Sequence, residues 1–278
     1  MKRTAFLPTL TLIVLGVPAA SSAQSALPTT QPSVLTIYRE DIRFGHSAAH
    51  ENTEAGWPLA YAKAKSPYTY LAISSITGPN EVWFLAPYAN WKALGDNFKQ
   101  DQSNPTLAAE LARLGMADAE HVSNSRALHL AGRPDLSAGA FPSVAKTRFY
   151  EVMFFRVRPG HEQTFEEVAK MYATVFAKAV PAGSYRTYQV VAGMPGPTYV
   201  VFSSSESLAS HDQGPAMDAA LMKTFTPDQL AALQKFSREG LINTESQRFA
   251  VNGRMSYVDD ATAATDPDFW RPGVKASK

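Results

Sequence analysis

The chain has 278 residues, of which 45% are hydrophobic and 18% charged, a balance typical of a folded globular protein and not of a disordered one. The formal charge of +1 gives no net field that would attract nucleic acid or an anionic membrane, so neither is an expected partner. The absence of cysteine excludes disulfides, thiolate nucleophiles and cysteine-based metal sites.

Residues 1–23 are predicted to be a secretory signal peptide. Lys2 and Arg3 form a positively charged start, an apolar stretch follows, and small residues precede an expected cleavage after Ala23. The apolar stretch is about 16 residues, which is short for a membrane-spanning helix, although an uncleaved anchor remains the alternative. We therefore expect a periplasmic or secreted protein without a membrane anchor after cleavage, beginning with a flexible, proline-rich leader at residues 24–31.

Three short blocks of sequence occur twice in the same order, which indicates an internal repeat. The matched glycines, at offsets of 115, 118 and 121 residues, are Gly45 with Gly160, Gly78 with Gly196, and Gly132 with Gly253. We infer two copies of one unit, residues 32–135 and residues 145–258, followed by a C-terminal tail at residues 259–278.

Each copy is predicted to have the β-α-β-β-α-β order of a ferredoxin-like unit. In the first copy the expected elements are a strand at 34–40, a helix at 47–65, a hairpin at 68–76 and 81–86, a helical stretch at 88–120 and a closing strand. In the second they are a strand at 149–157, a helix at 162–180, a hairpin at 185–192 and 198–203, a helical stretch at 206–246 and a closing strand. The predicted fold class is α+β, with two such units packed sheet to sheet.

The turn from the first strand into the first helix of the second copy, Val157-Arg158-Pro159-Gly160-His161, resembles the dimeric α/β-barrel superfamily. This superfamily includes antibiotic-biosynthesis-type monooxygenases and NIPSNAP-like domains. The resemblance extends over both copies and implies a barrel made by two units, here supplied by one chain, with self-association as a further possibility. It also implies a cofactor-independent oxygenase or isomerase that acts on a small aromatic or lipophilic molecule.

The first helix of the two copies differs in the face that should pack on the sheet. In the second copy this face is an apolar stripe at helical spacing, made of Phe165, Val168, Ala169, Tyr172, Val175, Phe176 and Ala179. At an offset of 115 the first copy has His50, Thr53, Glu54, Trp57, Ala60, Tyr61 and Ala64. Buried polar groups need partners, so this face is predicted either to line a pocket or to begin in solvent.

We predict a ligand pocket in the first copy, against this helix. Its expected lining residues from the helix and the neighbouring strands are Thr53, Glu54, Trp57, Tyr61, Tyr70, Trp83 and His129. His50 is the candidate catalytic residue, because imidazole titrates near neutral pH and suits proton transfer. His46, His50 and Glu54 recur at every fourth position and form a hypothetical divalent-metal site. The alternative for the strand aromatics is ordinary packing.

Three functions remain open from the sequence. The first is an exported small-molecule-binding protein, enzymatic or not, for which no cofactor is expected. The second is a non-catalytic binding or assembly module of the cell envelope. The third is a protein that holds haem or a metal through histidine. The sequence has no nucleotide-binding loop and no hydrolase nucleophile motif.

Overall fold

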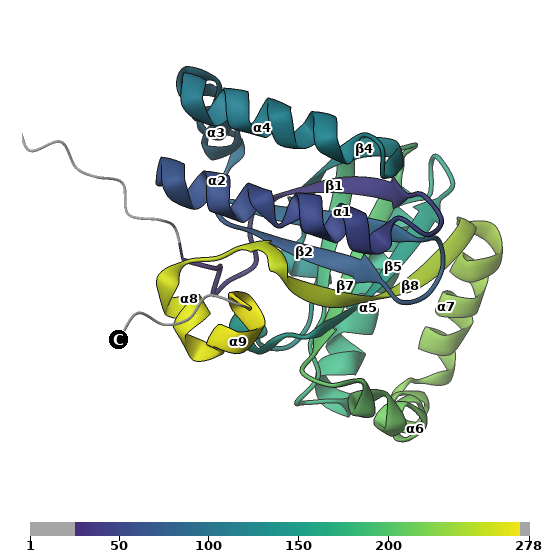
Figure 1. The fold of residues 1–278 in the computed structure, drawn as a ribbon. Helices are drawn as coiled ribbons and strands as arrows, with labels where there is room; N and C mark the ends of the chain where they lie inside the picture. The colour runs from purple at the N-terminus through teal and green to yellow at the C-terminus, as the bar shows by residue number, and fades with distance from the viewer. Residues whose placement is uncertain (1–25, 273–278) are drawn as a thin grey trace, which may run out of the picture.

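Eight antiparallel strands close into a barrel in the computed structural model, which describes residues 26–272 (Figure 1). The strands follow one another around the barrel in the order β1-β3-β2-β8-β5-β7-β6-β4. Their bounds are β1 Val34–Ile42, β2 Tyr70–Ser75, β3 Glu81–Tyr88, β4 Val122–Gly132, β5 Phe149–Val157, β6 Arg186–Ala192, β7 Thr198–Ser205 and β8 Leu241–Tyr257. The predicted α+β class is confirmed; the predicted signal peptide, residues 1–23, lies outside the described residues.

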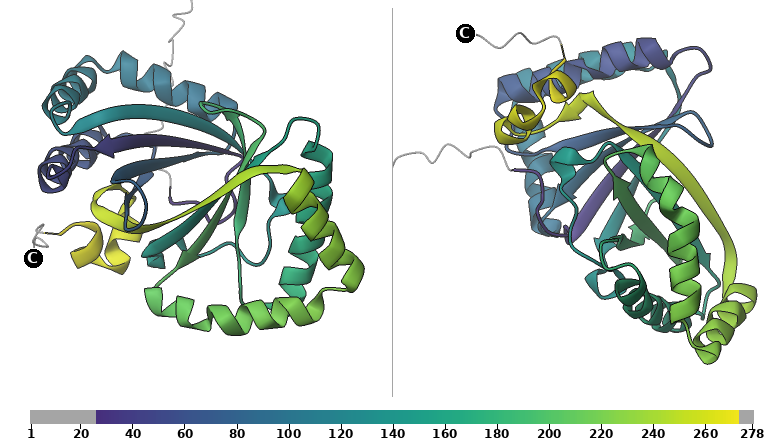
Figure 2. Two further views of the ribbon diagram at one scale, coloured as in Figure 1. Left: turned by 90° about the vertical axis from the view of Figure 1, so that its right-hand side faces the viewer. Right: turned by 90° about the horizontal axis from the view of Figure 1, so that it is seen from below.

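The helices cover the outside of the barrel in two groups, one over each half (Figure 2). The first group is α1 Ser47–Glu54, α2 Gly56–Ala64, α3 Trp91–Ser103 and α4 Pro105–Asp118, and the second is α5 Glu162–Ala179, α6 Gly214–Thr224 and α7 Pro227–Glu239. Two short helices, α8 Asp260–Thr265 and α9 Pro267–Trp270, follow the last strand. Within the described residues, none of the helices has the length and apolarity needed to cross a membrane.

Alternation along each strand sends one set of side chains into the barrel and the other toward the helices. On β1, Leu35 and Ile37 join the barrel core, while Tyr38 and Glu40 face the helix layer. The interior is filled by large apolar side chains from both halves, including Ile37, Ile73, Trp83, Leu128, Leu130, Val152, Val200 and Phe249. Burial of this shared core holds the two halves together.

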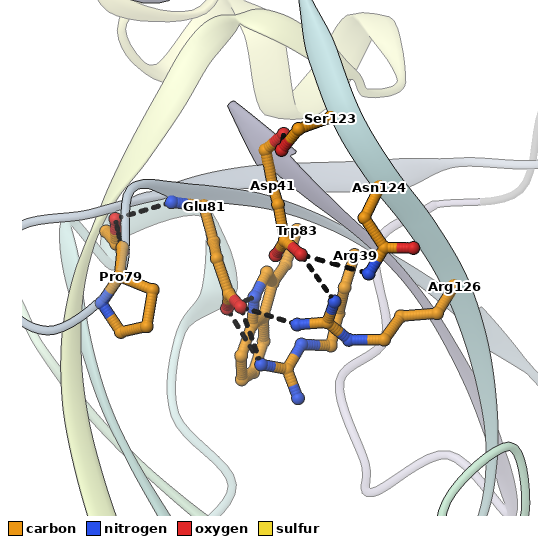
Figure 3. A network of polar contacts seen from close by, with 9 residues as sticks. Arg39, Asp41, Pro79, Glu81, Trp83, Ser123, Asn124 and Arg126 are labelled. Atoms are coloured by element: carbon orange, nitrogen blue, oxygen red, sulfur yellow. Dashed lines mark hydrogen bonds and ion pairs between the residues drawn. The ribbon is translucent and has the colours of Figure 1, made fainter. Parts of the chain in front are cut away.

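A network of charged groups surrounds Glu81 and ties strands β1, β3 and β4 together (Figure 3). The Glu81 carboxylate accepts hydrogen bonds from Arg39 at 2.8 and 2.9 Å, from Trp83 Nε1 at 2.6 Å and from Arg126 at 2.6 Å. Arg126 also donates to Asp41 at 2.7 Å. Because the buried Glu81 carboxylate is met by two guanidinium groups, we assign this network a structural role.

The helix predicted over residues 47–65 is interrupted at Ala55, so that α1 and α2 are separate. Pro58 has no backbone N–H to donate, which suits the first turn of a new helix. Gly56 brings α2 close to α4, because a Cβ at this position would lie 2.5 Å from Cδ2 of Leu114. The apolar stripe of α5, in contrast, runs through one unbroken helix.

The last strand begins earlier than predicted. The sequence predicts helix up to Ser246, but α7 ends at Glu239 and β8 begins at Leu241. Residues 241–250 pair with β5, and residues 249–257 pair with β2. The two-sided pairing of this one strand joins the halves of the barrel, and this long-range gain outweighs the local preference for helix.

Two segments predicted to lie outside the folded units pack onto the barrel. In the predicted leader, residues 24–31, Leu27 is buried and its backbone N–H donates to Asp259 at 3.1 Å. In the predicted tail, residues 259–278, Trp270 is buried, and the Arg148 guanidinium lies 3.8 Å from the Phe269 ring centroid. These apolar side chains join the barrel core, which gives residues 26–31 and 259–272 a defined place.

Candidate functional site

A pocket of about 290 Å³ lies between the helices α1, α2 and α3 and the outer face of the barrel. The strands that border it are β1, β2, β3 and β4, together with the end of β8. This volume is near the lower end of the range for small-molecule sites. Its wall is mainly aromatic and includes Trp57, Phe84, Phe98 and six tyrosines, namely Tyr38, Tyr61, Tyr68, Tyr70, Tyr88 and Tyr257. Two tyrosine hydroxyls already have partners, since Tyr88 donates to Asn97 and Tyr257 donates to the Ser66 carbonyl.

Four titratable side chains meet at the inner end of this pocket, and we call them the acid–histidine cluster: Glu40, His50, Glu54 and Asp118. One potential ligand atom from each lies within 4.8 Å of all the others. His50 Nδ1 is 2.8 Å from Asp118 Oδ1, and His50 Nε2 is 3.8 Å from Glu40 Oε2. The cluster draws on β1, α1 and α4, so only the folded chain assembles it.

Three of the four side chains in the cluster are almost completely removed from solvent, and the fourth, Glu40, is half-buried. His50 is 1% exposed, Glu54 4% and Asp118 5%. Glu40 and Glu54 border the pocket, whereas His50 and Asp118 lie behind them and do not line it. The pocket and the cluster therefore share two carboxylates.

Several buried polar atoms in this region have no hydrogen-bond partner within the described residues. They are Glu40 Oε2 and His50 Nε2 in the cluster and Trp57 Nε1, Tyr70 Oη and Asp101 Oδ1 around the pocket. Leaving such a group unpaired costs about 1–3 kcal/mol. Buried donors and acceptors without a protein partner are therefore concentrated at the pocket and the cluster.

Burial changes the protonation of the two carboxyl groups that border the pocket. Burial raises the pKa of Glu40 to about 7; the Asp118 charge adds to the rise and the His50 charge opposes it. Burial also raises the pKa of Glu54 to about 9, with further contributions from the charges of Glu40 and Asp118. In the protein alone, Glu54 therefore keeps its proton at neutral pH.

The structure places four of the predicted pocket residues on the pocket wall: Glu54, Trp57, Tyr61 and Tyr70. It places three elsewhere. Thr53 turns its hydroxyl to the Ala49 carbonyl, 3.2 Å away, and Trp83 lies inside the barrel. His129 packs against Trp91 with ring centroids 5.9 Å apart.

Of the predicted metal ligands, His50 and Glu54 belong to the cluster and His46 does not. His46 Nδ1 is instead 3.1 Å from His121 Nδ1. His46 precedes α1 as its N-terminal flanking residue, so the spacing of four residues does not place it over His50. No histidine lines the pocket, so the pocket does not fit a haem held by an imidazole.

Sequence analysis missed Glu40 and Asp118. Glu40 had a recognisable signal, because it is acidic at a strand position that points to the helix layer, and the residue at an offset of 115 is Phe155. Asp118 had a weaker signal, as an acid in the last turn of a helix, where the helix dipole disfavours negative charge. Neither signal identifies His50 as the partner.

No protein-family model matches the sequence, and no curated protein matches it either. Solved structures do resemble it. A candidate monooxygenase from Fusobacterium nucleatum has 9% identity and a TM-score of 0.54, with 80% of this chain and 93% of that chain covered. An anthrone oxidase-like protein has 10% identity and a TM-score of 0.50, with 81% and 93% covered. At such low identity the likeness concerns the fold alone, a mixed α+β structure built on a closed antiparallel barrel.

Proposed function

We propose that this chain binds a small aromatic molecule carrying a hydroxyl or carbonyl group and converts it in an oxygenase- or isomerase-type reaction. The observation that carries the proposal is the aromatic pocket of about 290 Å³ whose unpaired polar atoms surround one space. Aromatic walls with a few convergent polar groups are typical of sites for small organic ligands.

The pocket residues divide into walls and hydrogen-bonding groups. Tyr61 packs edge-on against Tyr70 at 6.0 Å and stacks on Tyr257 at 5.7 Å, which holds these rings in fixed orientations. Tyr70 Oη and Trp57 Nε1 are free to donate to a ligand oxygen. Asp101 Oδ1 is free to accept from a ligand hydroxyl. A planar ring with a polar substituent satisfies both requirements.

The reaction class is supported by the descriptions of the structural neighbours, which name a candidate monooxygenase and an anthrone oxidase-like protein. The predicted catalytic residue, His50, lies behind Glu40 and Glu54 and does not line the pocket. We therefore propose that His50 acts through these carboxylates as a positioning residue, while Glu40 and Glu54 face the ligand.

Binding is tested by titrating 1-naphthol and anthrone into the purified protein and following aromatic fluorescence and binding heat. Tyr70→Phe should weaken binding of the better probe by about two- to tenfold, since one hydrogen bond contributes about 0.5–1.5 kcal/mol. Tyr172→Phe, a matched change on α5 in the second half, should leave affinity unchanged. Absence of binding for both probes, or equal effects of the two variants, would contradict the proposal.

Catalysis is tested separately by measuring oxygen uptake and product formation with each bound probe. Turnover by the wild-type protein that decreases in the Glu54→Gln variant would support the proposal that the protein is an enzyme. Saturable binding without turnover would favour the non-catalytic envelope module expected as an alternative from the sequence.

We also propose that the halves of the barrel are tandem ferredoxin-like units, residues 32–135 and 145–258. Around the barrel, the order β4-β1-β3-β2 in the first half is followed by β8-β5-β7-β6 in the second. This is the same order when β1, β2, β3 and β4 are matched with β5, β6, β7 and β8. A register shift occurs at Asp41/Ile42 of β1 and at Arg156/Val157 of β5, again at an offset of 115. Experimental coordinates in which the halves fail to superpose strand for strand would refute this.

Export to the periplasm or beyond remains a proposal that is supported by the N-terminal charge and apolar pattern. N-terminal sequencing of the protein from its native host should give a start near Gln24. A start at Met1 in a cytoplasmic fraction would refute export. Self-association is a further proposal, to be tested by light scattering; one chain already closes the barrel, so a second copy is not needed for that.

A further inference from the structure

We infer that the acid–histidine cluster binds one divalent first-row transition-metal cation through Glu40, Glu54 and Nε2 of His50, with Asp118 orienting the imidazole. The cation class is Mn²⁺, Fe²⁺ or Zn²⁺. This inference goes beyond the proposed ligand binding and does not depend on it, although both use Glu40 and Glu54.

The separations within the cluster suit a single cation. Atoms bound to one cation at about 2.1 Å lie at most about 4.2 Å apart. One potential ligand atom from each of Glu40, His50 and Glu54 already lies within 4.8 Å of the others, so small side-chain adjustments bring these three residues into range. They come from one strand and two helices that pack together, and such elements position ligands more precisely than loops do.

The hydrogen bonding of His50 indicates a ligand on its other nitrogen. Nδ1 lies 2.8 Å from Asp118 Oδ1, which makes Nδ1 the protonated nitrogen and leaves a lone pair on Nε2. Nε2 is buried, has no partner within the described residues and points toward Glu40 Oε2 at 3.8 Å, beyond hydrogen-bond distance. Around protein-bound metals, a histidine usually binds the metal through one ring nitrogen while the other ring N–H donates to a carboxylate. His50 and Asp118 have the geometry of such a pair.

The lack of a lysine or arginine beside the three carboxyl groups, within the described residues, also favours a cation. Within the described residues no lysine or arginine forms an ion pair with Glu40, Glu54 or Asp118, and the only ion-pair contacts of Glu40 and Asp118 are with His50. A divalent cation would compensate the two carboxylates that bind it. One imidazole nitrogen with two carboxylate oxygens suits Mn²⁺, Fe²⁺ or Zn²⁺, whereas Ca²⁺ and Mg²⁺ prefer oxygen ligands alone.

The position of the site gives the cation a chemical role. Glu40 and Glu54 line the pocket, while His50 and Asp118 form the back of the cluster. A cation held by this set therefore borders the ligand pocket. There it would act as a Lewis acid toward an oxygen of the bound molecule.

The test is metal titration of tag-free mature protein that has been treated with a chelator and contains no organic ligand. Mn²⁺ binding is followed by the loss of the free-ion electron paramagnetic resonance signal, and Zn²⁺ binding by calorimetry. We expect one equivalent of either ion per chain, a higher melting temperature with metal, and at least tenfold weaker binding of Mg²⁺ and Ca²⁺. Failure of the wild-type protein to bind either ion stoichiometrically would overturn the inference.

Two variants test the proposed ligands, a third tests the orienting role of Asp118, and a fourth serves as a control. His50→Phe and Glu54→Gln should abolish stoichiometric binding, and Asp118→Asn should weaken it by about 10- to 100-fold. His46→Phe removes a histidine outside the cluster, so this variant should bind metal as tightly as the wild-type protein does. Circular dichroism confirms that each variant is folded. Unchanged binding by both folded His50→Phe and folded Glu54→Gln would overturn the site, even if the wild type binds metal.

The pocket variant separates this inference from the proposed function. Tyr70→Phe should keep full metal stoichiometry while binding the aromatic probe less tightly. Loss of probe binding in all proteins together with intact metal binding would refute the proposed function alone. Probe binding without any metal binding would refute the inference alone.

Discussion

The two halves of the barrel use the same region, between the first helix and the sheet, in opposite ways. In the first half His50 contacts Asp118 of α4 at 2.8 Å. In the second half Phe165 contacts Phe236 of α7, with ring centroids 5.8 Å apart. Glu40 is likewise matched by Phe155, which lies 5.9 Å from Phe165. Each polar contact of the cluster thus has an apolar counterpart.

The two halves also differ in that the larger cavity is the less polar one. A cavity of about 550 Å³, larger than the first-half pocket, borders Phe165 and Phe236 in the second half. Its lining is mostly apolar, and none of its lining residues has a buried polar atom without a partner within the described residues. In the first half, polar side chains stand where the second half buries apolar ones. Each large apolar side chain that is missing lowers the stability by about 1.5–3 kcal/mol, and the polar side chains in its place can form hydrogen bonds to a ligand.

The largest expected effect comes from placing a first-half residue in the second half. Phe165→His should lower the free energy of unfolding by about 3–5 kcal/mol, because it removes a buried ring and leaves an imidazole among Phe155, Tyr199 and Phe236. Urea unfolding followed by circular dichroism measures this. Phe165→Leu keeps an apolar side chain and should cost clearly less; equal costs would contradict the apolar role of this cluster.

The reverse exchange should show that the polar contacts act as a pair. His50→Phe alone leaves Asp118 buried without its partner, which should cost about 1–3 kcal/mol in metal-free protein. His50→Phe combined with Asp118→Leu should recover that loss, because the buried carboxylate that lost its histidine partner is then also gone. The coupling comes from a double-mutant cycle of unfolding free energies. Additive effects would show that the two side chains do not interact.

The interruption between α1 and α2 predicts a smaller effect. Gly56→Ala should destabilise by about 1 kcal/mol, since crowding against Leu114 at about 1–3 kcal/mol outweighs the gain in helix propensity of about 0.5–1 kcal/mol. Gly115→Ala is the matched control, because a Cβ there meets nothing within 4 Å. It should stabilise. The melting temperatures of both variants test this prediction. A higher melting temperature for Gly56→Ala than for the wild type would contradict the close approach of α2 to α4.

The smallest effect concerns an acid of the second half. A hydrogen bond from Arg133, at 2.6 Å, holds the pKa of Glu166 below its usual range despite partial burial. A depressed pKa contributes stability above the unfolded-state value, about 4.3, and this contribution is lost as the pH falls through the folded-state value. Glu166→Gln should therefore lower stability slightly at pH 7 and not at the acid end. Glu167→Gln, on the exposed side of α5, serves as control; equal pH profiles would refute the contribution.

The sequence by itself determined the features that depend on local periodicity. The repeated blocks indicated the order of strands and helices, and helical spacing predicted that Glu54, Trp57 and Tyr61 share one face of the first helix. Tyr70 was predicted beside them from the aromatic residues of the hairpin. Comparison of the matched positions also predicted a pocket in the first half, where a cavity of about 290 Å³ lies. These inferences hold because neighbouring residues on one element share a face wherever that element packs.

Only the tertiary structure decided which separate elements meet. Glu40 and Asp118 join His50 from a strand and a helix distant in the chain, and Trp83 turns into the barrel because of its position on β3. The early start of β8, and the burial of Leu27 and Trp270, likewise depend on surfaces made by residues far away in sequence. Long-range pairing and burial set these contacts, and their free energy exceeds the local preferences that a sequence pattern reports.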